Sequence, residues 1–344
     1  MRPATAGAMP QPQRPPAQAG FHGRLGLPFS FPESFPNAAI PGMIGIGEGT
    51  MRYGKTLAIA CLLLALAGCH GAEPPAPAAT TPHGPSGATT PAEAVLLPSR
   101  DLRDNDLAAF ARDAVPPALH ARLDLAWHGG RTRWPLDELP LGEKVPAILA
   151  ALAAPGSEVR IGRSYDQQLA GAGGELRSAA LALGMFGDKY VANEGDFSPD
   201  ERVHYRQLVA ATSRWAARAP LSESKRAHAA IARLATAARA TGLRSEADFA
   251  RLGMDDSLRR LSAFEIVLKQ VLAGYGLDLD ATLAGMRATE VERDGDLARV
   301  RMQYRFAGRD IDATIGVERR DGRWYVVDFL RHAEDAAAAA TPAR

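Results

Sequence analysis

The spacing of apolar residues changes near Gly276, and this change limits the fold of the chain more than any other feature. Before it, from Val95 to about Tyr275, apolar side chains recur every three or four residues, as on one face of a helix. After it they alternate with polar residues, as in half-buried strands. Helices followed by strands are typical of the α+β class. We therefore expect a helical region over residues 95–275 and an antiparallel β-meander over residues 276–334.

The helical region carries clear start and stop signals. Ser198 precedes Pro199 and stands three residues before Glu201, the arrangement of a capping box at a helix start. A second helix is expected to open at residues 220–223, and its apolar stripe is Ala227, Ile231, Leu234 and Ala238. The longest pattern runs from Asp256 to Ala273, after which Gly274 ends the helix.

The meander is predicted from two alternating segments and three short turns. In one segment Val300, Met302, Tyr304 and Phe306 alternate with polar residues, and in the next Ile311, Ala313, Ile315 and Val317 do so. The dipeptides Asp294-Gly295 and Asp321-Gly322 favour type I′ hairpin turns, and residues 307–309 join the two central strands.

The fourth strand is expected over Arg323–Phe329 and is apolar on both faces. A sheet of four strands needs a partner on its apolar face. We expect the amphipathic helix over Leu258–Leu272 to cover it, because this helix directly precedes the meander.

The order of helices and strands, with the closing segment Arg320–Val326, resembles the C-terminal half of NTF2-like (SnoaL-like) domains. The resemblance covers about the last third of the chain that follows residue 68. It implies a curved sheet and helices around an apolar pocket. That family includes both enzymes and non-catalytic binding proteins, so the resemblance leaves the activity open.

A short apolar run over Leu57–Leu66 follows two basic residues, Arg52 and Lys55. The run is too short to cross a bilayer, which takes about 20 apolar residues. It ends in Leu66-Ala67-Gly68-Cys69. A basic start, an apolar centre and small residues at a cleavage site are typical of a secretory signal. The segment resembles the lipobox of bacterial lipoproteins.

This resemblance implies that Cys69 carries lipid, including a palmitate-type acyl chain, and that the signal peptide, residues 51–68, is removed. Residue two of the mature chain is then His70 rather than Asp, which favours a lipid anchor in the outer membrane, facing the periplasm. Two or more acyl chains hold a protein stably at a membrane. The expected partners are this membrane, through Cys69, and a protein of the cell envelope.

The segments around the signal have their own compositions. Residues 1–50 are rich in Pro and Gly, and we expect them to be untranslated or disordered, with Met51 as the true initiator. Residues 69–94 are rich in Pro, Ala and Thr and form an expected linker. Residues 335–344 form an expected disordered tail.

Charge and cysteine content exclude some classes of protein. The net charge is +1 and no run of Lys and Arg occurs, so we expect no nucleic-acid partner. The two cysteines are Cys61, which leaves with the signal, and Cys69, which carries the lipid. The mature chain therefore forms no disulfide, although the periplasm permits one.

The sequence contains no catalytic, metal-binding or nucleotide-binding signature, and we expect no enzyme activity, no cofactor and no metal. We expect His204 and His228 at the surface or at a helix edge, and His332 in a frayed C-terminal segment. The carboxylates near the capping box are interpreted as caps and loop residues: Asp188, Glu194, Asp196, Asp200 and Glu201. Trp127 and Trp134 flank a Gly/Arg loop and are interpreted mainly as packing residues.

Three arginines share one face of a predicted strand and form the candidate anion-binding site: Arg299, Arg301 and Arg305. Guanidinium groups suit carboxylates of the cell wall or lipid phosphates. The favoured alternative is a solvated face with cross-strand partners such as Asp312 and Glu318.

Three functions remain open. The preferred one is a non-enzymatic envelope lipoprotein that binds a protein, and an immunity protein against a secreted toxin is a variant of it. The second is a carrier of a small apolar ligand in an NTF2-like pocket. The third, a hydrolase, requires a buried carboxylate next to a histidine in a pocket.

Overall fold

The computed structural model describes residues 87–138 and 142–338, and the expected signal segment with Cys69 lies outside them. The elements have these bounds: α2 Pro91–Arg103, α3 Leu107–Asp113, α4 Pro117–His128, 3-10 helix η1 Leu136–Glu138, 3-10 helix η2 Gly142–Lys144, α5 Val145–Ala153, α6 Ser157–Gln168, α7 Gly173–Asn193, α8 Pro199–Ala216, α9 Ser224–Thr241, α10 Glu246–Leu252, α11 Met254–Ala273, α12 Leu279–Ala284, β1 Arg287–Asp294, β2 Leu297–Phe306, β3 Arg309–Arg320, β4 Arg323–Val326 and α13 Val327–Ala338.

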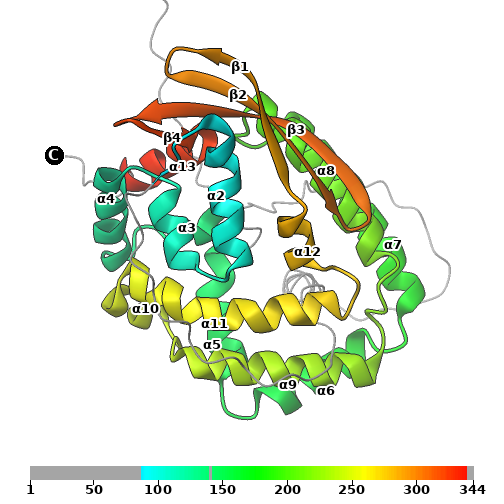
Figure 1. Cartoon of the computed structure of the whole chain (residues 1–344). Helices are drawn as coiled ribbons and strands as arrows, with labels where there is room; N and C mark the ends of the chain where they lie inside the picture. The colour runs from blue at the N-terminus through cyan, green and yellow to red at the C-terminus, as the bar shows by residue number, and fades with distance from the viewer. Residues whose placement is uncertain (1–86, 139–141, 339–344) are drawn as a thin grey trace, which may run out of the picture.

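The strands form one antiparallel sheet in the order β1-β2-β3-β4, so the predicted α+β fold and the meander are confirmed (Figure 1). The predicted alternation is also confirmed, because Val300 and Met302 are buried while Arg299 and Arg301 are exposed. β1 is an edge strand with a bulge between Glu290 and Glu292.

Two of the three turns have both loop residues in the left-handed region that a type I′ turn requires. In the turn before β4, Asp321 has a φ of 50° and Gly322 a φ of 79°. Ala307 and Gly308 form the turn between β2 and β3 in the same way. The prediction for Asp294-Gly295 is wrong by one residue. Asp294 still pairs with Leu297, so the loop is Gly295 and Asp296.

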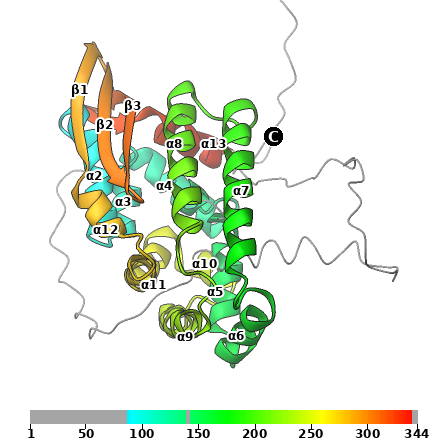
Figure 2. The same ribbon diagram turned by 90° about the vertical axis from the view of Figure 1, so that its right-hand side faces the viewer.

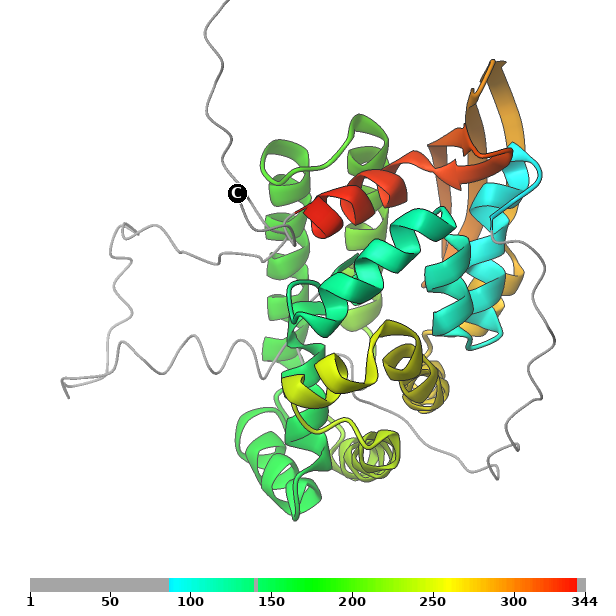
Figure 3. The ribbon, with the colours of Figure 1, turned by 90° about the vertical axis from the view of Figure 1, so that its left-hand side faces the viewer.

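The helix that covers the apolar face of the sheet is α2, and the prediction that Leu258–Leu272 does so is wrong. Ala94 and Val95 of α2 join one apolar cluster with Val300, Met302 and Trp324 of the sheet. Figures 1 and 3 show α2 beside the strands, with α11 farther away. The stripe on α11 instead packs against α3, α4 and α9, because helices surround it there.

The start of α2 also shortens the expected linker. Residues 69–94 overlap the helix, which begins at Pro91 behind the N-cap Thr90. Just before it, Ala88 pairs with Trp324 of β4. The part of the expected linker before residue 87 lies outside the described residues.

The end of the meander differs from the prediction. β4 stops at Val326, and the chain continues as helix α13. Leu330, Ala333 and Ala337 are spaced by three and four residues and are buried along one face of this helix. The expected strand over Arg323–Phe329 is therefore too long, and the expected disordered tail from residue 335 overlaps α13 as far as Ala338.

Helix α8 runs along the edge of β3 that β4 leaves open. The side-chain amide of Gln207 accepts from the Asp312 N–H at 3.0 Å and donates to the Asp312 carbonyl at 2.7 Å. The predicted capping box at Ser198 is confirmed at the start of this helix. Figure 2 shows α7 packed on the far side of α8 from the sheet. The open edge of β3 is thus covered by a helix, which protects an exposed strand from pairing with another chain.

The remaining helices enclose a second and larger core. Its members include Trp127, Trp134 and Tyr165, all almost completely buried. The predicted stripe on α9 is confirmed, since its four apolar residues are buried: Ala227, Ile231, Leu234 and Ala238.

Candidate functional site

A cleft of about 480 Å³ opens between the start of α8 and the polar face of the sheet. It is lined by Ser198, Pro199, Asp200, Glu292, Asp294, Leu297, Ala298, Arg299, Gly316, Val317, Val327 and Asp328. Gly316 stands opposite Arg299 in the sheet. A Cβ atom at Gly316 would lie 3.6 Å from the Val327 side chain, which is an ordinary van der Waals contact.

The rim of this cleft is acidic. Arg299 is neutralised by Asp200 at 2.9 Å. Glu292 on β1 stands opposite Arg299 on β2. The carboxylates of Glu292 and Asp294 are exposed, and neither has an ion-pair or hydrogen-bond partner in the described part of the chain. Leu297 lies beside them and is 55% exposed. An apolar side chain next to two unpaired carboxylates suits the aliphatic stem and charged head of a lysine or arginine.

Asp328 lines the cleft at the start of α13, and its side chain is largely buried. It accepts a hydrogen bond of 3.1 Å from the Ser198 hydroxyl. Burial and the nearby charge of Glu201 raise the pKa of Asp328 above its ordinary value. The Ser198 hydroxyl is thus directed to a carboxylate and not to a histidine.

His332 is the largest departure from the sequence analysis. The prediction that it lies in a frayed segment is wrong, because it is only 9% exposed on α13. Its Nδ1 lies 2.6 Å from Oε2 of Glu138, and its Nε2 lies 3.5 Å from Oε1 of Glu201. Burial lowers the pKa of His332, but the hydrogen bond to Glu138 and the two negative charges outweigh burial and raise the pKa above 6.5.

Glu201 is the centre of this network. Its carboxylate accepts from the backbone N–H of Ser198 at 2.7 Å, from Arg331 at 2.6 Å and from the Tyr205 hydroxyl at 3.3 Å. A histidine between carboxylates is an arrangement that general-base chemistry uses. However, the residues lining the neighbouring cleft include no histidine and no cysteine. The network thus joins η1, α8 and α13 and reaches the cleft through Ser198 and Asp328, while His332 is not among the lining residues.

The two other predicted histidine positions differ from each other. His228 is exposed, as predicted, and pairs with Asp166 at 2.9 Å. His204 is half-buried on α8, where its Nε2 lies 2.7 Å from the Tyr304 hydroxyl. Burial lowers the pKa of His204 to about 4, so this side chain is neutral at physiological pH.

The candidate anion-binding row lies on one face of β2, as the alternation predicts. Arg301 is paired with Asp312 across the strands, which is one of the expected partners. Arg299 takes Asp200 rather than Glu318, and Arg305 contacts the Gly308 carbonyl at 3.4 Å. Two of the three guanidinium groups already have carboxylate partners, and binding of an anion by the row remains a prediction.

Trp127 and Trp134 are packing residues, as expected. Arg133 lies between them in the chain, and its guanidinium carbon stands 5.0 Å from the Trp127 ring centroid and 5.7 Å from that of Phe249. It also pairs with Glu246 at 2.8 Å. The loop is thus held by a largely buried arginine stacked on aromatic rings.

The sequence gives no sign of two buried acids, Asp101 near the end of α2 and Glu265 in the middle of α11. Burial, with the charge of Asp113, raises the pKa of Asp101 to about 7. Burial likewise raises the pKa of Glu265 to about 7. Lys269 is 5% exposed and donates to the Asn105 side chain and the Leu102 carbonyl. No motif in the sequence marks these residues, because α2 and α11 are far apart in the chain and only the packing of the folded protein buries their acids.

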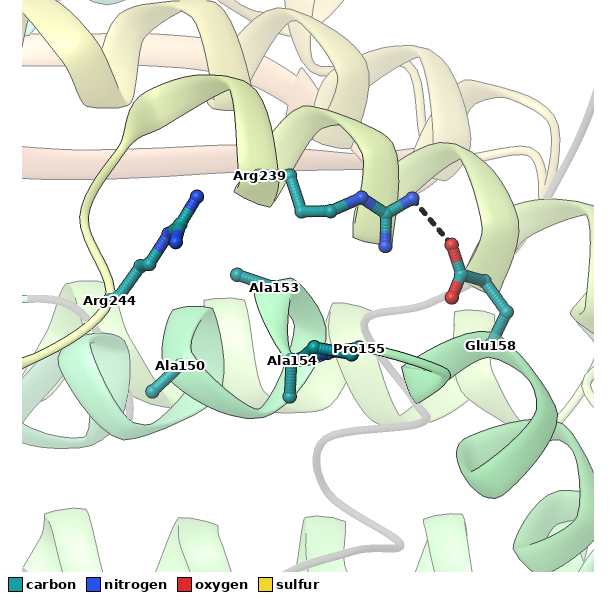
Figure 4. A pocket seen from close by; sticks show the side chains of 7 residues that line it. All are labelled: Ala150, Ala153, Ala154, Pro155, Glu158, Arg239 and Arg244. Atoms are coloured by element: carbon teal, nitrogen blue, oxygen red, sulfur yellow. Dashed lines mark hydrogen bonds and ion pairs between the residues drawn. The ribbon is translucent and has the colours of Figure 1, made fainter.

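A second pocket, of about 510 Å³, lies between the end of α5 and the end of α9 (Figure 4). Arg239 and Arg244 extend over a floor of alanines, and Arg239 is paired with Glu158. Within the described residues, Arg244 is therefore the one lining arginine of this pocket without a carboxylate partner, whereas the cleft has two carboxylates without partners.

Within residues 87–138 and 142–338, no group of three or more His, Cys, Asp or Glu residues is placed to hold a metal ion. None of the helices in these ranges combines the length and the apolar character that a bilayer crossing needs. No protein-family model matches the chain, and neither a curated protein nor a solved structure matches it.

Proposed function

We propose that this protein is a non-enzymatic lipoprotein of the cell envelope, anchored in the outer membrane through Cys69 and facing the periplasm. The proposal is supported by the basic start, the apolar run and the segment Leu66-Ala67-Gly68-Cys69. In such lipoproteins a diacylglyceryl group is attached to the cysteine thiol, and the new amino terminus is acylated as well. An anchor with two or more acyl chains is stable.

We further propose that the body binds an envelope protein, and the observation that carries this is the acidic, partly apolar cleft. Glu292 and Asp294 are unpaired next to the exposed side chain of Leu297. Charge complementarity favours a partner that presents a lysine or arginine. A rim of exposed charges steers the encounter, and the apolar wall contributes burial once the side chain is seated.

The anchor is tested by growing cells with an alkyne-labelled palmitate and comparing the wild-type chain with Cys69→Ser. We expect label on the wild-type protein and none on the variant, and we expect the labelled protein in the outer-membrane fraction. Equal labelling of both chains would contradict lipidation at Cys69.

The binding function is tested by placing a photo-crosslinking amino acid at Leu297 in intact cells, with Leu125 as the exposed control on α4. We expect a reproducible protein adduct from position 297 and not from 125. The double substitution Glu292→Lys and Asp294→Lys should abolish the adduct. Asp310→Lys, with the same kind of charge change at the far end of β3, should leave it. An adduct that survives the double change would contradict recognition by the acidic rim.

A further inference from the structure

Helix α7 has two opposite faces, and the first is packed closely on α8. Gly184 and Gly187 allow this approach. A Cβ atom at Gly184 would lie 2.2 Å from the Ser213 hydroxyl, and one at Gly187 would lie 3.1 Å from Val209. The buried residues of α7, Ala180 and Val191, are on the same side of the helix. This face is fully used within the chain.

The opposite face is directed to solvent and is unusually apolar. At 3.6 residues per turn, the positions centred on Ala182 share one face. They are Glu175, Ser178, Ala179, Ala182, Met185, Phe186 and Lys189. Met185 is 66% exposed and Phe186 is 61% exposed, although both are large apolar side chains. Figure 2 shows α7 as the outermost helix on this side, with α8 between it and the sheet.

The face is self-complementary about Ala182. If a second copy of α7 lies antiparallel with a two-fold axis at Ala182, residues at similar distances before and after Ala182 come to the same height, and those on the same side of the face meet. Met185 then lies beside Ser178 of the second copy, and Phe186 beside Ala179, because these pairs are on the same side of the contact at similar heights. Each large side chain is opposed by a small one, which is the size relationship that close helix packing needs.

Charge follows the same symmetry. Glu175 and Lys189 lie seven residues to either side of Ala182, so the two-fold axis brings each one to the other in the second copy. Both side chains are exposed, and neither has a partner among the residues that the structure describes. Two unpaired opposite charges at equal distances from the centre would form two identical ion pairs at the ends of the contact.

We propose that the outward face of α7 is a homodimer interface, in which two copies pack antiparallel through Met185, Phe186 and the small residues around Ala182. One helix on another buries less surface than the roughly 1,600 Å² of a standard interface. We therefore expect a dissociation constant in the micromolar range in solution. The proposal depends neither on the anchor nor on the cleft partner.

A charge swap tests the symmetry. Sedimentation equilibrium of the full chain in mild detergent should show a monomer–dimer equilibrium. Glu175→Lys and Lys189→Glu should each weaken the dimer by about tenfold, because each brings like charges together. The double variant should restore wild-type affinity, since the pairs are re-formed with reversed sign. A wild-type chain that stays monomeric throughout the accessible concentrations, or a double variant no better than the single ones, would overturn the proposal.

A cysteine on the axis gives an independent test. In a full chain with Cys61→Ser and Cys69→Ser, Ala182→Cys should form a disulfide-linked dimer under mild oxidation, because this residue meets its own copy. Gln167→Cys, at an exposed position on α6, is the control. Equal crosslinking of both would overturn the two-fold contact. The alternative is that this face binds lipid. A monomeric chain that sediments with phosphatidylglycerol vesicles, and no longer does so with Phe186→Ser, would support lipid binding and overturn the dimer proposal.

Discussion

His332 on α13 and Glu138 at the end of η1 are 194 residues apart in the chain and share a hydrogen bond of 2.6 Å between Nδ1 and Oε2. Both side chains are largely buried, and Glu201 of α8 lies on the other side of the imidazole. The three elements thus meet at one histidine. A histidine held by two carboxylates stabilises the fold most while it is charged.

The stability that His332 contributes should depend on pH. Its pKa is raised in the folded state, so its contribution is complete below the ordinary value of 6.5 and is lost as the pH rises through the folded-state pKa. We expect His332→Gln to lower the free energy of unfolding by about 1–3 kcal/mol at pH 5.5 and by less at pH 9. Urea unfolding at the two pH values measures this difference. His228→Gln, at an exposed pair, should change the free energy by less than about 1 kcal/mol at both, and an equal loss at both pH values for His332→Gln would contradict the charged network.

Asp101 should change stability with pH in the same direction as His332, although here the folded state favours the neutral form. Burial, with the charge of Asp113, raises its pKa from 3.8 to about 7, so the folded chain binds a proton that the unfolded chain releases. Stability from this group is complete below pH 3.8 and is lost as the pH rises through about 7. We expect Asp101→Asn to gain stability relative to wild type between pH 5 and pH 8, by up to about 4 kcal/mol. Denaturant unfolding across this range is the measurement. Asp104→Asn, at an exposed neighbour, should stay within about 0.5 kcal/mol of wild type.

The signals that the sequence carries locally were sufficient for much of the fold. Ser198 and Glu201 satisfy each other within four residues, and Asp321-Gly322 adopts the turn that its left-handed preference favours. The alternation around Val300 likewise needs only the period of a strand. In each case the interaction that decides the structure is close in the sequence, so the pattern is enough to predict it.

The predictions that were wrong concern residues whose contacts are far away in the sequence. Nothing near α11 in the sequence indicates that its stripe packs against α9 and α3 rather than against the sheet. His332 was expected to be frayed because its partners, Glu138 and Glu201, are far away in the chain. A signal for α13 was present in the spacing of Leu330, Ala333 and Ala337, but the apolar run from Trp324 favoured a longer strand.

The close contact between α7 and α8 predicts a stability effect opposite to helix propensity. Gly→Ala inside a helix normally stabilises by about 1 kcal/mol. At Gly184 the added methyl would lie 2.2 Å from the Ser213 hydroxyl, so we expect Gly184→Ala to destabilise by about 1–3 kcal/mol. Thermal and urea unfolding measure the change. Gly174→Ala, where nothing lies within 4 Å, should be neutral or stabilising. Adding Ser213→Gly should recover part of the loss, and a stabilising Gly184→Ala would contradict the close packing.

Gln207 should protect the open edge of β3. Its side-chain amide both donates to and accepts from the backbone of Asp312, which replaces the missing neighbouring strand. Gln207→Leu removes both bonds and exposes the strand edge, and we expect a loss of about 1–3 kcal/mol in the free energy of unfolding. Amide hydrogen exchange should speed up at Asp312, while the amides that pair β2 with β3 elsewhere stay protected. Gln207→Glu keeps the acceptor for the Asp312 N–H and loses only the donor, so its exchange at Asp312 should lie between wild type and Gln207→Leu. Unchanged exchange in Gln207→Leu would show that α8 covers this edge by packing alone.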